Sequence, residues 1–152
     1  MRRDSRLSVA LHVLLHMEEL GGVLTSDALG PMLEVHPVAL RRTLAGLRKA
    51  GIVRSVKGHG GGWSLARGLD AISLREVYAA LGTPPVFSIG PRVESPGCLV
   101  EQAVNRSLEK ALDAAQALLL EQLGRVSVAS IAADVRRKGS YPPRKKAPKA
   151  HA

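Results

Sequence analysis

The sequence has 152 residues, a formal net charge of +9 and a single cysteine. Its length suits one domain with appended segments, and it is too short for an α/β-hydrolase or a complete dinucleotide-binding enzyme. One cysteine excludes an intrachain disulfide and a cysteine-rich metal site, and an aromatic content of only 3% favours a core of packed helices with aliphatic side chains.

The N-terminal stretch MRRDSRLSVALHVLLHM starts with basic residues and continues with apolar ones, as signal peptides do. His12 and His16 interrupt the apolar run and no small-residue cleavage site follows, so we predict a cytoplasmic protein without a membrane span. The apolar residues recur at helical spacing, which predicts an amphipathic helix from Ser5 to Leu20 that ends at Gly21. The two histidines have no third ligand nearby, and no metal site is predicted.

Two further helices follow, joined by a short turn. A Thr-Ser pair at 25–26 caps a short helix that ends at Leu33, and His36-Pro37 marks the restart, because proline favours the first helical position. The next helix is predicted over 37–50. Its polar side carries four cations: Arg41, Arg42, Arg48 and Lys49. Two helices in this arrangement, the second with exposed cations, predict a helix-turn-helix.

A glycine-rich run, KGHGGGWSLAR, follows the third helix. It lies between two short alternating segments, 52–56 and 62–66, which predict a two-stranded hairpin. HGGGW also resembles the oxyanion motif of some esterases, but no G-x-S-x-G nucleophile elbow occurs. A P-loop is absent as well, and a G-x-G-x-x-G motif would need glycine where Trp63 stands. We therefore assign the glycines to the hairpin turn, where they permit positive φ.

The second half of the chain predicts a short helix over 73–81, a Gly- and Pro-rich linker over 82–97, and a long helix over 98–124. Seven residues of the long helix form an apolar stripe: Val104, Leu108, Ala111, Leu112, Ala115, Leu118 and Leu119. The stripe fits packing on its own domain or, more economically, against a second copy of the chain. A last helix is predicted over 127–135, and residues 136–152 read as a disordered basic tail.

The segment HPVALRRTLAGLRKAGIVRSVKGHGGGWSLAR resembles the winged-helix core of the Rrf2 family of bacterial transcriptional regulators. The similarity extends through ISLREVYAAL to the start of the long helix, and covers the chain from about Ser5 to Val135. It implies a mainly α fold with a small β-hairpin: a winged helix-turn-helix domain over 1–81, a linker, and a dimerisation helix grouped with the last short helix over 98–135. It also implies a cytoplasmic homodimer that represses or activates promoters.

Carried over by position, the resemblance places base-reading residues at Arg41 and Arg42 and the start of the recognition helix at His36, Pro37 and Val38. Lys57 falls at the wing position that reaches the minor groove, and the wing turn contains His59, Gly60 and Gly61. Arg48 and Lys49, near the end of the helix, are better placed for phosphate contacts. Independently of the family, seven cations and no acid lie between Val35 and Leu69, which suits a polyanion.

The chain departs from the best-known family members, which hold an iron–sulfur cluster with three cysteines in the linker and a further ligand. Cys98 matches only the third of these cysteines, so we predict a member without a cluster or other cofactor. The N-terminus of the long helix would favour its thiolate, which makes Cys98 a candidate thiol sensor. The alternative is an ordinary half-buried cysteine.

The sequence therefore predicts a transcriptional regulator, and specifically a repressor, that binds a pseudo-palindromic operator in double-stranded DNA as a homodimer. An effector of unidentified chemistry is an expected further partner. The alternative from another class is a winged-helix module that binds protein and uses its basic tail as a nonspecific tether to nucleic acid. The sequence shows no paired carboxylates, no catalytic triad and no cluster of metal ligands, so we do not predict an enzyme.

Overall fold

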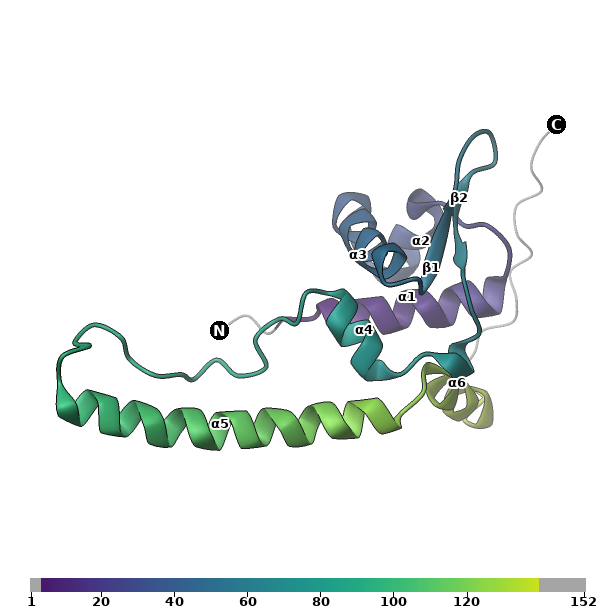
Figure 1. Cartoon of the computed structure of the whole chain (residues 1–152). Coiled ribbons are helices and arrows are strands. Elements are labelled where there is room, and N and C mark those ends of the chain that lie inside the picture. Colours follow the sequence, from purple (N-terminus) through teal and green to yellow (C-terminus); the bar gives the residue numbers. More distant parts are fainter. Residues whose placement is uncertain (1–3, 140–152) are drawn as a thin grey trace.

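The fold is mainly helical with one small antiparallel hairpin, in a computed structural model that describes residues 4–139 (Figure 1). In chain order the elements are α1 (Arg6–Leu20), α2 (Ser26–Leu33), α3 (Pro37–Lys49), β1 (Val53–Val56), β2 (Gly62–Leu65), a 3₁₀ turn η1 (Leu69–Ala71), α4 (Leu74–Ala80), α5 (Leu99–Arg125) and α6 (Val128–Arg137). The predicted fold class is confirmed, with helix ends within about two residues of the expected ones.

Helix α1 lies at the centre of the core. Its buried residues Val13, Leu14 and Met17 face the other elements, and α1 contacts α2, α3, α4, α6 and β2. From α3 the core receives three fully buried leucines, Leu40, Leu44 and Leu47. The spacing of these leucines gives α3 one apolar side, so that α3 is held against α1 and its opposite side stays free.

Local capping fixes where α2 and α3 start. The Thr25 hydroxyl accepts a hydrogen bond from the backbone N–H of Ala28 at 3.1 Å. His36 does the same for α3: its Nδ1 accepts from the N–H of Val38 at 3.3 Å, and Pro37 takes the first helical position. These side chains satisfy backbone donors that have no partner inside the helix. The predicted start of the recognition helix is therefore built by residues of its own first turn.

The hairpin pairs β1 with β2 from Val53 opposite Leu65 to Val56 opposite Gly62. In the turn, Gly58 has φ +93° and Gly60 has φ +76°, the left-handed conformations that glycine adopts without strain. The glycine run therefore turns the hairpin.

Trp63 ties the base of the hairpin to the segment before α2. Its backbone N–H and C=O each form a 2.8 Å hydrogen bond with Leu24, and its Nε1 donates to the Ser26 hydroxyl at 3.1 Å. The side chain is half-buried against the core. Trp63 therefore packs at the base of the wing.

The winged-helix unit consists of α1 to α4 with the hairpin. Helix α6 belongs to its core, although the sequence grouped α6 with the long helix. Val128 is fully buried and Ala132 nearly so, and α6 contacts α1 and η1. Two backbone hydrogen bonds join the strand-like segments beside it, from Leu74 N–H to Val126 C=O at 3.0 Å and from Val128 N–H to Ile72 C=O at 2.9 Å. The chain leaves this unit along the linker and returns to it along α5.

The C-terminal boundary also differs from the expected one. Helix α6 continues two residues past Val135 and ends at Arg137, so Arg136 and Arg137 are helical rather than part of a tail. The rest of the predicted tail, residues 140–152, lies outside the described residues.

Helix α5 extends well beyond the winged-helix unit, and the linker runs outward beside it to its far end (Figure 1). None of its 27 residues is buried, and it contacts the unit through α4. Side chains of its first turns hold the linker: Gln102 Nε2 donates to the Pro96 carbonyl at 2.8 Å, and Asn105 Nδ2 to the Arg92 carbonyl at 2.6 Å. Within residues 4–139, no helix is both long and apolar enough to cross a bilayer.

Candidate nucleic-acid interface

The side of α3 that faces away from the core carries Val38, Arg42, Ala45 and Lys49, all exposed. They recur at intervals of three and four residues, which places them in one row along the helix. Two members of the row are cations and none is acidic. The row is rigidly placed, because the three leucines on the opposite side are fully buried.

Two more cations flank this row on the side of α2 and the hairpin. Arg41 Nη2 lies 3.4 Å from Asp27 Oδ1 of α2, and Arg48 Nη1 donates to the Ser55 hydroxyl of β1 at 3.4 Å. The sequence treated Arg41 and Arg42 as an equivalent pair. The structure separates them: Arg41 has a carboxylate beside it, whereas the guanidinium of Arg42 forms no hydrogen bond or ion pair with any residue in 4–139.

Asp27 is an acidic residue of this surface that the sequence did not reveal. It lies fourteen positions before Arg41, outside the acid-free window, and only the packing of α2 on α3 brings the two together. Both side chains are largely exposed, 54% for Arg41 and 75% for Asp27. An exposed pair of this kind contributes at most about 1 kcal/mol, so Arg41 is free to exchange Asp27 for another anion.

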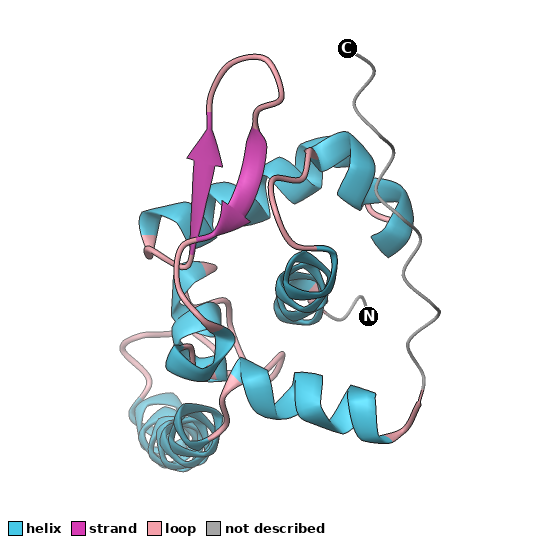
Figure 2. Cartoon of the chain, turned by 90° about the vertical axis from the view of Figure 1, so that its right-hand side faces the viewer, coloured by secondary structure: helices cyan, strands magenta, loops and turns pink. Residues whose placement is uncertain are grey.

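The wing supplies a second group of cations. Its tip stands clear of the helices in both views (Figures 1 and 2), and Lys57, His59 and Gly60 are exposed while Gly61 is half-buried. Arg54 on β1, which the sequence did not assign to the site, is also exposed, and its Nε donates to the Ser64 hydroxyl at 3.0 Å. The hairpin thus extends the cationic surface of α3.

The start of α3 has a mixed character. His36 is exposed but its Nδ1 is used in the helix cap, which leaves its Nε2 as the ring atom open to a ligand. Pro37 is half-buried, and Val38 is 48% exposed at the head of the outward row. An exposed valine there can make an apolar contact, for example with the methyl group of thymine.

Six of the seven stripe residues of α5 are solvent-exposed in the single chain, and Leu112 is half-buried. Leu118 is 59% and Val104 51% exposed. Cys98 occupies the cap position before α5 and its thiol is exposed, so the half-buried alternative is wrong.

An iron–sulfur cluster does not fit the donor atoms of this chain. Cys98 is its single thiol. Among residues 4–139, no three His, Cys, Asp or Glu side chains lie close enough together to hold a metal ion. The linker next to Cys98 is instead secured by hydrogen bonds, including one from the Ser95 backbone N–H to Glu101 Oε1 at 3.0 Å.

Comparison with known proteins agrees with the family resemblance found in the sequence. A family model described as "Rrf2: Iron-dependent Transcriptional regulator" matches residues 3–134. The "Putative HTH-type transcriptional regulator YffB" of Lactococcus lactis is 31% identical over 136 residues, which is 87% of either chain. The protein YwnA of Bacillus subtilis, named in the same way, is 28% identical over 84% of this chain and 95% of its own. A solved "putative transcriptional regulator" from Lactobacillus plantarum shares the fold with a TM-score of 0.74, at 22% identity over 89% of this chain and 92% of its own.

Proposed function

Because this chain belongs to the Rrf2 family of transcriptional regulators, we propose that it represses transcription by binding a pseudo-palindromic operator as a homodimer, without an iron–sulfur cluster. It is a DNA-binding regulator and not an enzyme. The observation that carries the finer proposal is the exposed cationic surface of α3 and the wing, with its outward row opposite three fully buried leucines.

In the proposed complex, α3 enters the major groove and the wing lies over the neighbouring minor groove. Arg42 is the strongest candidate for base reading, because it lies in the outward row and has no partner within residues 4–139. A bidentate guanidinium–guanine contact discriminates by roughly 1–3 kcal/mol. Arg48, Lys49 and Lys57 lie at the end of the helix and on the wing, where contacts to phosphates position the protein without reading sequence.

The proposed dimer forms through α5. A helix of 27 residues without one buried side chain leaves its apolar stripe in water unless a partner covers it. A second copy is the simplest partner, because a twofold axis pairs identical stripes and doubles the recognition helix. Two helices presented one DNA turn apart, about 34 Å, would match a pseudo-palindromic operator.

Footprinting on the promoter of its own gene region, followed by binding to the protected duplex, tests this function. We expect Arg42→Ala to lose about tenfold or more in affinity for the operator while binding to a scrambled duplex falls much less. Lys49→Ala should weaken both duplexes similarly. Affinity should fall by about 10³ between 50 and 200 mM salt if six or more phosphates are contacted.

Residues beyond the described part of the chain add cations of their own, so the full chain is compared with one that ends at Gly139. Preserved sequence preference in the shorter chain supports recognition by α3 and the wing. If all DNA binding is lost with the tail and neither Arg42 nor Lys49 matters, the protein-binding module is the better description.

The cluster-free part of the proposal has a separate test. Anaerobic incubation of the purified protein with iron and sulfide should leave no charge-transfer absorption in the visible range, because one thiol per chain provides too few ligands. A stable brown protein would show that the chain holds a cluster and would contradict this part of the proposal.

Cys98 is proposed as the sensing residue because its thiol is exposed at the start of the dimerisation helix. Peroxide or an electrophile should then release the wild-type protein from its operator and leave Cys98→Ser bound. Equal release of both proteins would remove Cys98 from the regulatory mechanism.

A further inference from the structure

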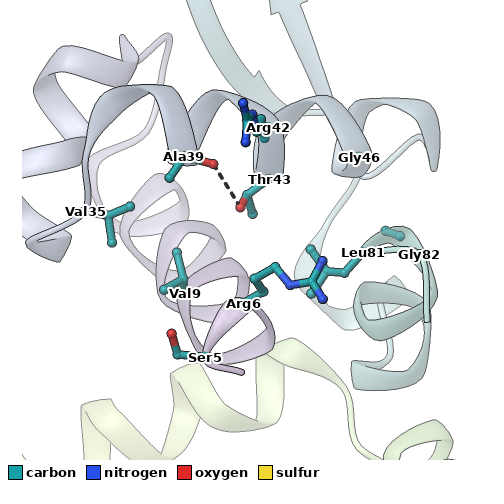
Figure 3. A pocket seen from close by; sticks show the side chains of 11 residues that line it. Ser5, Arg6, Val9, Val35, Ala39, Arg42, Thr43, Gly46, Leu81 and Gly82 are labelled. Carbon is teal, nitrogen blue, oxygen red and sulfur yellow. Dashed lines mark hydrogen bonds between the residues drawn. The ribbon is translucent and has the colours of Figure 1, made fainter. Parts of the chain in front are cut away.

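A cavity of about 600 Å³ lies behind the recognition helix, between the start of α1, one flank of α3 and the end of α4 (Figure 3). This volume is in the range that small-molecule sites occupy. Its walls include Val9, Val35, Ala39 and Leu81, so most of the surface that a ligand would meet is apolar. An apolar body of modest size would gain free energy by leaving water for this space.

The charged groups of the cavity are all of one sign. Of the described residues that line it, two are charged: Arg6 from α1 and Arg42 from α3. Figure 3 shows the Arg6 side chain reaching across the opening toward Leu81. Neither guanidinium is committed to the core, because both residues are exposed.

Arg6 already binds a carboxylate of its own chain. Its Nε lies 3.0 and 2.9 Å from the two carboxylate oxygens of Asp4, and this hydrogen bonding lowers the pKa of Asp4 to about 2. Both side chains are exposed to water, so a competing carboxylate could take the place of Asp4 at small cost. Arg42 has no competing partner within residues 4–139.

We propose that this cavity binds a small organic anion with an apolar body, and that the bound anion weakens DNA binding by drawing Arg42 from the operator. The chemistry of the ligand follows from the lining: apolar walls hold the body, and two guanidinium groups hold a carboxylate or sulfonate. Ligand binding does not depend on the proposed function, whereas its effect on DNA rests on it.

The position of the cavity gives a direct route to the recognition helix. Ala39, Arg42, Thr43 and Gly46 of α3 all line it. Where Gly46 and Ala80 line the cavity, α3 and α4 touch: a Cβ on Gly46 would lie 2.5 Å from the Ala80 carbonyl oxygen. A ligand wedged beside this contact acts on α3 and also on the end of α4, from which the linker leads to α5.

Binding is tested with the full chain and 8-anilinonaphthalene-1-sulfonate (ANS), an apolar anion that fluoresces when it leaves water. We expect one ANS per chain, displaced by octanoate at a concentration at least about tenfold lower than by the uncharged 1-octanol. Val9→Trp fills the cavity and should abolish binding, while Ser8→Trp adds the same side chain at an exposed neighbour outside the cavity and should not.

A second variant covers the case that Val9→Trp does not fold, which circular dichroism detects. Arg6→Gln should weaken ANS binding about tenfold, whereas Arg136→Gln, an exposed arginine on α6, should leave it unchanged. ANS binding that survives in a folded Val9→Trp protein, or is absent from the wild type, overturns the site. ANS binding that survives in the folded Val9→Trp protein would belong to another apolar surface, for example the stripe of α5.

The regulatory effect is measured on operator DNA with the same proteins. Octanoate should raise the protein concentration needed for half-saturation in the wild type and in Ser8→Trp, but not in Val9→Trp. Bound octanoate without any change in DNA affinity overturns the regulatory part of the proposal. If no protein binds the operator while ANS binding behaves as expected, the proposed function fails and the ligand site stands.

Discussion

Arg41 and Arg42 are neighbours in the chain but lie in different electrostatic surroundings. Arg41 stands 3.4 Å from the Asp27 carboxylate, whereas Arg42 faces outward at the rim of the cavity behind α3. A carboxylate beside a cation lowers the attraction of that cation for DNA. Arg42 is therefore available to a base edge at once, and Arg41 only after leaving Asp27.

Asp27→Asn should raise the affinity for any duplex several-fold at low salt, because it removes the acidic neighbour of Arg41. Stability should change by less than about 1 kcal/mol, since the pair is exposed. Asp113→Asn, the same change on exposed α5, is the matched control in a fluorescence anisotropy titration. Equal effects of the two variants would mean that Arg41 does not approach DNA.

Gly61 is the glycine of the wing with the least space around it. A Cβ there would lie 2.4 Å from the Val56 carbonyl oxygen and 2.8 Å from that of Gly58. Gly61→Ala should therefore displace the wing, destabilise the protein by roughly 2 kcal/mol and weaken operator binding. Gly90→Ala, which has open space and no positive φ, should be neutral in the same urea denaturation experiment.

At the scale of single elements, α4 shows how local interactions define a helix start. The Ser73 hydroxyl accepts from the Glu76 N–H at 3.2 Å, and Glu76 accepts from the Ser73 N–H at 2.8 Å, which together form a capping box. Arg67 adds a 2.7 Å ion pair to the same carboxylate. Hydrogen bonds from Ser73 and then Arg67 lower the pKa of Glu76 below its ordinary value of 4.5.

This lowered pKa makes a prediction about acid stability. Glu76 binds a proton more weakly in the folded than in the unfolded chain. Its contribution to the free energy of unfolding is therefore complete above pH 4.5, and it is lost as the pH falls through the lower pKa of the folded state. The free energy of unfolding should therefore decline on acidification less steeply in Glu76→Gln than in the wild type. Parallel profiles in urea denaturation would contradict the role of this carboxylate.

Helix α6 is a structural part of the winged-helix unit, so its core residue should matter for folding. Val128→Ala removes two methyl groups from a fully buried site and should destabilise the protein by roughly 2 kcal/mol. Val104→Ala on exposed α5 is the matched control and should cost the folded single chain little. Equal loss in dilute denaturation experiments would mean that α5 is as important to the unit as α6.

At the scale of the whole molecule, the winged-helix unit has a closed core while α5 has none. All seven stripe residues are at least partly exposed. The linker is joined to the unit by a hydrogen bond from the Tyr78 hydroxyl to the Pro84 carbonyl, and to the start of α5 by further side-chain hydrogen bonds. This architecture leaves the long apolar surface of α5 uncovered. The proposed dimer provides the cover and sets the spacing of the two recognition helices.

Leu118→Glu should convert the protein into a monomer in sedimentation equilibrium, because it places a charge on the apolar stripe of the proposed interface. Affinity for a full operator should fall strongly, while binding to half of it changes little. Ala117→Glu introduces the same charge at an exposed neighbour off the stripe and should remain dimeric. A dimeric Leu118→Glu protein would place the interface elsewhere.

Much of the fold could be predicted because its signals are local. The caps at Thr25, His36 and Ser73, the glycine turn and the periodic leucines of α3 each depend on residues within a few positions of one another. Backbone hydrogen bonds and helical periodicity act over that same range. The assignment of the cationic residues of α3 and the wing to one surface rests on the resemblance to the family and on the acid-free window between Val35 and Leu69, and stays a prediction.

Other features needed the packed chain, because they join residues that no spacing connects. The approach of Asp27 to Arg41, the return of α6 to the core and the cavity shared by α1, α3 and α4 all arise from contacts between separate elements. Burial is a property of the assembled core, and neither Val128 nor Val104 shows in its local sequence that one is buried and the other exposed. The sequence alone determined which positions carry cationic or apolar side chains, and the packing of the helices decided which of these side chains became neighbours.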